Sequence, residues 1–142
     1  TADGKHLPGT ILRLVYKLKG VDMMSLVTNA LKYAGYDGGV EPDSDFIIED
    51  GVCKLKDHSS LAGSIATMDK VVKVAVEAGI PLEDAVRMAS ESPAKVMGCF
   101  DRVGSLEDGK DADIVIFDGN PLEIATNVEI TIIDGKIVWQ RE

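Results

Sequence analysis

The residue best placed for chemistry in this chain is an amide, Asn29, which follows directly on an apolar run from Met23 to Thr28. A run of about five to six mostly apolar residues without in-and-out alternation is typical of a strand buried on both faces, as in parallel sheets covered by helices. Ligands and catalytic groups in such sheets collect at the carboxyl ends of the strands. We therefore expect Asn29 to face a site, although an amide cannot take up or release a proton at neutral pH. The alternative is that its side chain only closes a turn at the strand end.

The histidines and cysteines form no metal-binding or redox motif of their own. His6 and His58 lie far apart, without a helical HxxxH pair or a cysteine companion, so no self-contained metal site is expected. Cys53 and Cys99 make no CxxC pair, and we expect both to pack as ordinary apolar side chains in a reducing compartment. His58 stands in a polar stretch and is expected in a solvated loop.

Length and charge exclude several classes of partner. With 142 residues, 45% of them hydrophobic, the chain can form a core of about one domain's size. A net charge of -9 repels phosphate backbones and anionic lipid, so neither nucleic acid nor a membrane is expected as a partner. No apolar stretch approaches the roughly 20 residues of a membrane span and no signal core is visible, so we expect a cytoplasmic protein. The chain opens on Thr1 rather than Met and reads as part of a longer protein.

The elements around Asn29 alternate between helix and strand. Pro8 and Gly20 bracket an amphipathic helix over 9–19, which leads into the strand at 23–28, so that His6 would end the preceding strand. After a glycine-rich loop over 35–45, a hairpin is expected between the apolar runs 46–48 and 52–55. Three helices should follow: one that contains residues 71–76 and is stopped by Gly79, one from Pro81 to about Ser90, and a short one that starts at Ser92 and is ended by Gly98. The last elements are strands over 113–117, 128–133 and 136–139, and Asp134 with Gly135 predicts a second hairpin between the last two. The whole pattern predicts an α/β fold.

Several blocks of the sequence, in order and at fitting distances, resemble one known family. They are Asp3, Gly4, His6 and Pro8; Leu26 to Ala30 with Ala34 and Gly35; Leu61 to Ser64 with Thr67 and Met68; Asp84 to Ala89; and Pro93 with Ala94. On these blocks the chain is similar to the N-acetylglucosamine-6-phosphate deacetylases over essentially its whole length. The stretch from Gly104 to Asp113 is less specific, because it resembles the wider amidohydrolase superfamily.

This resemblance implies an architecture. The chain would supply the carboxyl-terminal part of a TIM (β/α)8 barrel, plus strands of a small β-sandwich domain. Residues 1–103 would form barrel units, with 23–28 as the eighth strand, and residues 104–142 would form sandwich strands. A complete barrel needs about 250 residues, so this chain alone would leave the barrel open. We expect such an opened barrel to self-associate.

The resemblance also implies a cofactor and partners. The full-length protein would bind a divalent metal, expected to be zinc, through Glu and His ligands upstream of Thr1, and none would be held by this chain. Its partner would be a small-molecule amino-sugar phosphate, and it would form a homo-oligomer, such as a dimer.

Site residues follow from the same resemblance. In the family, a metal-activated water attacks the acetamide of N-acetylglucosamine 6-phosphate, and an Asp at the end of the eighth strand takes and returns the proton. Asn29 stands at the position of that Asp. Without a titratable carboxylate, general acid–base help worth roughly 10²- to 10⁴-fold should be lost. Two segments are implied to bind substrate, and their residues are Asp3, Gly4, Lys5, His6, Leu61, Ala62 and Gly63.

Two other functions fit the sequence. In the first, the protein binds an amino-sugar phosphate without turning it over. In the second, it is another amidohydrolase, such as a cyclic amidase or a deaminase, with which the stretch from Gly104 to Asp113 agrees equally well.

Overall fold

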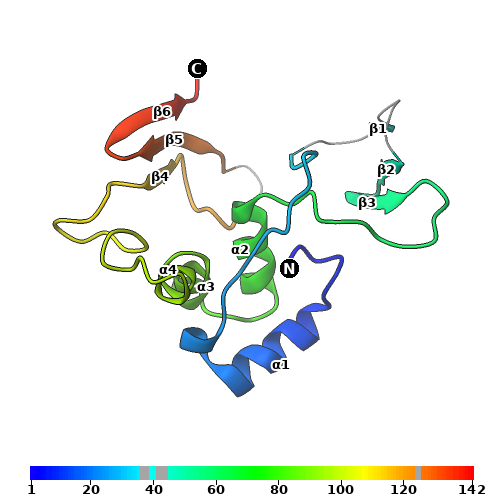
Figure 1. Ribbon diagram of the computed structural model, residues 1–142, viewed down its shortest axis with the longest axis horizontal. Helices are drawn as coiled ribbons and strands as arrows, with labels where there is room; N and C mark the ends of the chain where they lie inside the picture. The colour runs from blue at the N-terminus through cyan, green and yellow to red at the C-terminus, as the bar shows by residue number, and fades with distance from the viewer. Residues whose placement is uncertain (36–38, 41–44, 124–125) are drawn as a thin grey trace.

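The computed structural model describes residues 1–35, 39–40, 45–123 and 126–142. Within these ranges, two small antiparallel sheets lie at opposite ends of the long axis of the molecule, with the helices between and below them (Figure 1). The helices are α1 (Gly9–Lys19), α2 (Met68–Glu77), α3 (Leu82–Ala89), α4 (Glu91–Val96) and a short 3₁₀ helix, η1 (Val21–Met23). The strands are β1 (Gly39–Val40), β2 (Phe46–Glu49), β3 (Val52–Leu55), β4 (Ile114–Phe117), β5 (Val128–Ile133) and β6 (Lys136–Gln140).

The helices begin and end close to where the sequence predicts, although α4 begins at Glu91, one residue before the predicted start at Ser92. Pro8, with φ of -59°, precedes α1, and Gly20, with φ of 74°, follows it. Pro81 precedes α3, whose first turn carries two acidic residues that oppose the positive end of the helix dipole. The helices enclose the main core together with Leu26, and the fully buried Met88 of α3 lies in that core. Of the helices that the structure describes, none is long and apolar enough to cross a membrane.

Both predicted hairpins are confirmed. Strands β2 and β3 pair with Glu49 opposite Val52, and Asp50 and Gly51 between them have φ of 53° and 69°. Positive φ at both turn residues is the requirement of a type I′ turn, which matches the twist of the flanking strands. The same pair of residue types recurs between β5 and β6, where the two φ angles are 50° and 70°. Of the glycine-rich loop expected over 35–45, residues 36–38 and 41–44 lie outside the described residues, and 39–40 form β1 against β2.

The prediction of a buried strand over 23–28 is wrong. Residues 21–23 form η1, none of residues 24–29 belongs to a strand, and Ala30 makes an isolated parallel bridge to Ser64. Only Leu26 of this run is buried, and its N–H bonds to the carbonyl of Met88 at 2.8 Å, while Met23 and Val27 are 74% and 49% exposed. A parallel strand requires neighbours along its edges, and no described strand lies beside this run. The strand expected to end at His6 is also absent, since residues 3–7 form bends and residues 1–2 belong to no strand.

Candidate functional site

A tight turn over residues 3–6 places an aspartate against a histidine. Oδ1 of Asp3 accepts hydrogen bonds from the backbone N–H groups of Lys5 (3.0 Å) and His6 (2.9 Å). Oδ2 of Asp3 lies 2.7 Å from Nδ1 of the His6 ring. Gly4 makes the turn possible with φ of 77°, which other residues rarely adopt. Asp3 is only 4% exposed, so this carboxylate is part of the interior of the protein.

The same histidine joins this turn to the loop at residues 61–64. Nε2 of His6 lies 2.7 Å from the carbonyl oxygen of Ala62. A carboxylate and a carbonyl both act only as acceptors, so this geometry favours a ring in which both nitrogens carry a proton, the imidazolium. In agreement, the Ala62 carbonyl and the Asp3 carboxylate raise the pKa of His6 above its ordinary value of 6.5, although partial burial opposes them.

The 61–64 loop in turn holds the backbone of Asn29. The N–H of Ser64 donates to the Asn29 carbonyl at 3.1 Å, and the N–H of Leu31 donates to the Ser64 carbonyl at 2.8 Å. Asn29 itself has φ of 48°, in the left-handed region that Asn tolerates better than most residues. On its other side the loop is fixed to β3, because the N–H of Ala62 donates to the Cys53 carbonyl at 2.9 Å.

The Ser64 side chain links the 61–64 loop to Asp3 in the turn at residues 3–6. Asp3, Ser64 and Ser92 are the buried polar side chains of the described residues, and the first two belong to this cluster. The Ser64 hydroxyl donates to Asp3 and accepts from the N–H of Ala66 at 3.0 Å. Burial would raise the pKa of Asp3, but the N–H groups of His6 and Lys5, the Ser64 hydroxyl and the His6 ring hold it well below its ordinary value. The carboxylate is therefore charged throughout the physiological range.

The structure thus brings together most of the residues that the resemblance implies. His6 contacts Ala62 directly, and the 61–64 loop contacts Asn29 through the backbone. Lys5 contributes its N–H to Asp3 while its side chain is exposed, and Leu61 is 44% exposed. The sequence alone assigns Ser64 no role, although it lies in one of the matching blocks. Its position directly after Gly63, next to the residues implied to bind substrate, is the sequence feature that could have pointed to it.

No metal centre is formed by these residues. Among the described ranges, no group of three or more His, Cys, Asp or Glu side chains is arranged to hold a metal ion. The two cysteines are not paired with each other; Cys53 is fully buried, and its burial raises the pKa of the thiol. This burial confirms the expectation that Cys53 packs in a core. The His58 side chain is 57% exposed, as expected for a solvated loop.

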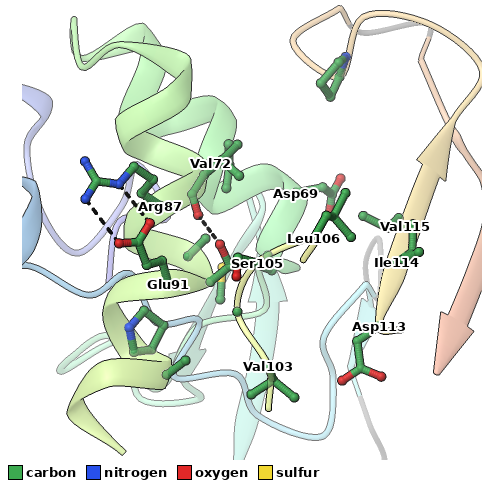
Figure 2. A pocket seen from close by; sticks show the side chains of 18 of the residues that line it. Asp69, Val72, Arg87, Glu91, Val103, Ser105, Leu106, Asp113, Ile114 and Val115 are labelled. Carbon is green, nitrogen blue, oxygen red and sulfur yellow. Dashed lines mark hydrogen bonds and ion pairs between the residues drawn. The ribbon is translucent and has the colours of Figure 1, made fainter. Parts of the chain in front are cut away.

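A cleft of about 1030 Å³ lies away from this cluster, between the helices α2 to α4, the 99–113 segment and β4 (Figure 2). Its walls include Val72, Leu106 and Val115, and the charged Arg87 and Glu91, which also line it, are paired with each other. None of the residues implied to bind substrate lines this cleft. We therefore locate the candidate site at the cluster of Asp3, His6, Asn29 and the 61–64 loop, where unlike charges and convergent polar groups meet.

Comparisons with known proteins agree on one family. The sequence profile of the amidohydrolase family matches residues 10–138. The chain is 34% identical to N-acetylglucosamine-6-phosphate deacetylase of Haemophilus influenzae, over 94% of this chain and 35% of that protein. It is 33% identical to the human protein of the same name, over 99% of this chain and 34% of that protein. The chain therefore spans about a third of the length of the curated relatives it matches.

Solved structures give the same result. The Pasteurella multocida deacetylase superposes with a TM-score of 0.81 at 36% identity, covering 96% of this chain and 35% of that one. An aspartate-to-alanine variant of the Mycobacterium smegmatis deacetylase, in complex with N-acetyl-D-glucosamine-6-phosphate, superposes with a TM-score of 0.82 at 32% identity, covering 96% and 36%. The α/β elements described above are thus about a third of a TIM-barrel amidohydrolase fold, which confirms the predicted fold class.

Proposed function

The chain belongs to the amidohydrolase family, and from this we propose that the full-length protein binds N-acetylglucosamine 6-phosphate at the Asp3, His6, Asn29 and 61–64 cluster. The reaction of this site would be hydrolysis of the acetamide: water adds to the carbonyl carbon, the C–N bond breaks, and acetate and the free amine leave. In this chain, Asn29 makes that reaction slow.

The observation that carries the proposal is the hydrogen bond from His6 to the Ala62 carbonyl at 2.7 Å. It joins the two segments implied to bind substrate, which are far apart in the sequence, and the second of them bonds to Asn29. Asp3 and His6 pair at 2.7 Å and carry no net charge together, so they add nothing to the net charge of -9 that repels an anionic substrate.

Asn29 limits what the site can do. Its amide can donate and accept hydrogen bonds, so it can hold a water molecule or the acetamide of a substrate. It cannot take a proton from the attacking water or return one to the leaving amine, and this help is worth roughly 10²- to 10⁴-fold. Amidohydrolases are generally metal-dependent, but the described residues do not fit a metal ion. We therefore assign no step on a metal to these residues, and we propose zinc ligands elsewhere in the full-length protein.

Acetate release tests the proposal. The protein extended by its upstream segment is assayed with zinc and N-acetylglucosamine 6-phosphate, first as it stands and then as Asn29→Asp. We expect the Asp variant to be about 10²- to 10⁴-fold faster. The matched control is Asn120→Asp, an identical change at an exposed turn whose side chain accepts from the N–H of Leu122. An Asn29→Asp variant no faster than this control would remove the role proposed for position 29.

A binding protein without turnover is the second candidate. It is favoured by the aspartate-to-alanine variant of the Mycobacterium smegmatis deacetylase, which is in complex with N-acetyl-D-glucosamine-6-phosphate. Titration calorimetry on the unmodified full-length protein separates the two. Binding without acetate release, unchanged by Asn29→Asp, supports the second candidate, whereas absence of binding contradicts both.

A further inference from the structure

Asp3 has no free capacity to bind a ligand. One oxygen accepts from two backbone N–H groups, at 3.0 and 2.9 Å, and the other faces the His6 ring at 2.7 Å. The Ser64 hydroxyl is a further donor, and the residue is 4% exposed. A carboxylate whose oxygens are all engaged inside the protein cannot exchange them for a substrate without opening the turn. The role of Asp3 must therefore act through its neighbours.

The neighbour on which it acts is His6. The ring lies between two acceptors, the Asp3 carboxylate and the Ala62 carbonyl, and this arrangement favours a proton on each nitrogen. The charged groups that act on the ring are Asp3, which favours the imidazolium, and the amino group of Thr1, which opposes it. An upstream residue would convert that amino group into a neutral amide, so the balance would shift further toward the imidazolium.

We propose that Asp3 is a positioning residue: its carboxylate holds His6 as an imidazolium that donates to the Ala62 carbonyl, and so keeps the two segments of the candidate site joined. The purpose of this contact, which is to hold both segments in place for an anionic sugar phosphate, rests on the proposed function. The contact itself rests only on the distances within the cluster. Because the carboxylate lies 2.7 Å from the ring, the pair carries no net charge.

The variant Asp3→Asn separates charge from structure. The amide oxygen can still accept from the N–H groups of Lys5 and His6, so the turn keeps its hydrogen bonds. The amide NH₂, however, would donate to Nδ1 of His6. The ring then becomes the neutral tautomer with its proton on Nε2, which still donates to Ala62. The hydrogen bond from His6 to the Ala62 carbonyl remains, and the positive charge of the ring is lost.

Histidine NMR tests this directly. The full-length protein is labelled with nitrogen-15 in histidine, and the His6 ring signals are identified by their absence in His6→Gln. We expect an imidazolium that persists above pH 6.5 in the unmodified protein, and a neutral Nε2–H tautomer near neutral pH in Asp3→Asn. The control is Asp57→Asn, which removes a charge from the neighbour of the other histidine and should leave the His6 signals unchanged.

Two results would overturn the inference. One is a His6 ring that is already neutral at pH 6.5 in the unmodified protein, a measurement that needs no variant to fold. The other is a His6 ring whose protonation is the same in Asp3→Asn. Neither result depends on activity. The inference can therefore fail while the proposed function stands, and the proposed function can fail while the inference stands.

Kinetics then test the purpose of this contact. In the background of Asn29→Asp, the change Asp3→Asn should raise KM for the phosphorylated substrate, because a neutral ring donates a weaker hydrogen bond to Ala62 and holds the two segments less firmly. The value of kcat should change less than KM. A loss in kcat with KM unchanged would show that Asp3 acts on the chemical step and not on substrate binding.

Discussion

Gly63 lies so close to Leu31 that no side chain fits between them. A Cβ added at Gly63 would lie 2.8 Å from Cγ and 3.0 Å from Cδ2 of Leu31, and 3.3 Å from the carbonyl oxygen of Asn29. The φ angle of Gly63 is outside the left-handed region, so the constraint is one of space and not of backbone conformation. This contact keeps the 61–64 loop against the segment that carries Asn29.

The variant Gly63→Ala should therefore be less stable. Overpacking a tight contact typically costs about 1–3 kcal/mol, and we expect the free energy of unfolding to fall by this amount in urea titrations. The double variant Gly63→Ala with Leu31→Ala removes both clashing carbons, so its loss should be smaller than the sum of the two single losses. A strictly additive pair would show that the clash with Leu31 is not the cause.

Local signals in the sequence predict the turns and helices of this chain well. Asp50 with Gly51 and Asp134 with Gly135 give type I′ turns, because the residues that adopt positive φ are themselves in the turn. Pro8 and Gly20 fix the ends of α1 in the same way. These features depend on a few adjacent residues, all of which the chain supplies.

Features that depend on distant partners were predicted less well. The run 23–28 has the composition of a buried strand, but a strand also needs neighbours, and none of the described strands pairs with it. At the candidate site, the resemblance implied roles for His6, Asn29 and the 61–64 loop, and it implied that Asp3 contacts the substrate directly. Its 4% exposure and its engaged oxygens could not be read from the sequence, because they depend on His6 and Ser64 folding around it.

The Asp3–His6 pair should make stability depend on pH in two directions. The pKa of His6 is raised above 6.5, so its contribution is fully present below pH 6.5 and is lost as the pH rises through the higher pKa of the folded state. The pKa of Asp3 is lowered below 3.8, so its contribution is present above pH 3.8 and is lost as the pH falls through the lower folded value. We expect the pair to stabilise the fold most between these limits.

Urea unfolding at a series of pH values checks this expectation. The difference in stability between the unmodified protein and His6→Gln should be largest near pH 6 and shrink as the pH rises. His58→Gln is the control, because that side chain is 57% exposed and its removal should change stability by no more than about 0.5 kcal/mol. A difference for His6→Gln that stays constant from pH 6 to 9 would contradict the link to ring protonation.

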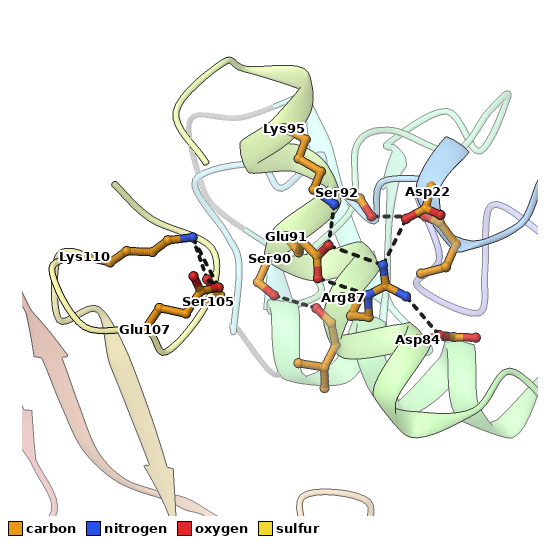
Figure 3. A network of polar contacts seen from close by, with 12 residues as sticks. Asp22, Asp84, Arg87, Ser90, Glu91, Ser92, Lys95, Ser105, Glu107 and Lys110 are labelled. Carbon is orange, nitrogen blue, oxygen red and sulfur yellow. Dashed lines mark hydrogen bonds and ion pairs between the residues drawn. The ribbon is translucent and has the colours of Figure 1, made fainter. Parts of the chain in front are cut away.

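Glu91 is held as a carboxylate by two cations on the surface of the helices (Figure 3). Arg87 Nε lies 3.0 Å from Oε2 of Glu91, and Lys95 contacts the other oxygen. Hydrogen bonds from Arg87, then from Lys95, lower the pKa of Glu91 from 4.5 to about 2. Arg87→Gln should raise this pKa part of the way back, and Lys95→Gln should raise it less.

Carboxyl-carbon NMR titration of Glu91 measures both changes. Because the pKa of Glu91 is lowered, its contribution to stability is present above pH 4.5 and is lost as the pH falls toward 2. In Arg87→Gln this loss should begin at a higher pH. A larger shift for Lys95→Gln than for Arg87→Gln would contradict the order of the two partners.

Strand β6 leaves an apolar edge open to solvent. In the sheet order β4-β5-β6 it pairs with β5 alone among the described strands, and Ile137, Val138 and Trp139 are 59%, 55% and 47% exposed. Unpaired edges with exposed apolar side chains template pairing with another chain, and a lysine placed in such an edge opposes it. We expect the 142-residue chain alone to self-associate, and Val138→Lys to reduce the associated fraction in light scattering. The control is Thr10→Lys, which adds the same charge to an exposed position of α1 and should change the associated fraction little. An equal effect of both variants would show that association responds to net charge and not to the edge of β6. A monodisperse monomer of the unmodified chain would contradict the prediction.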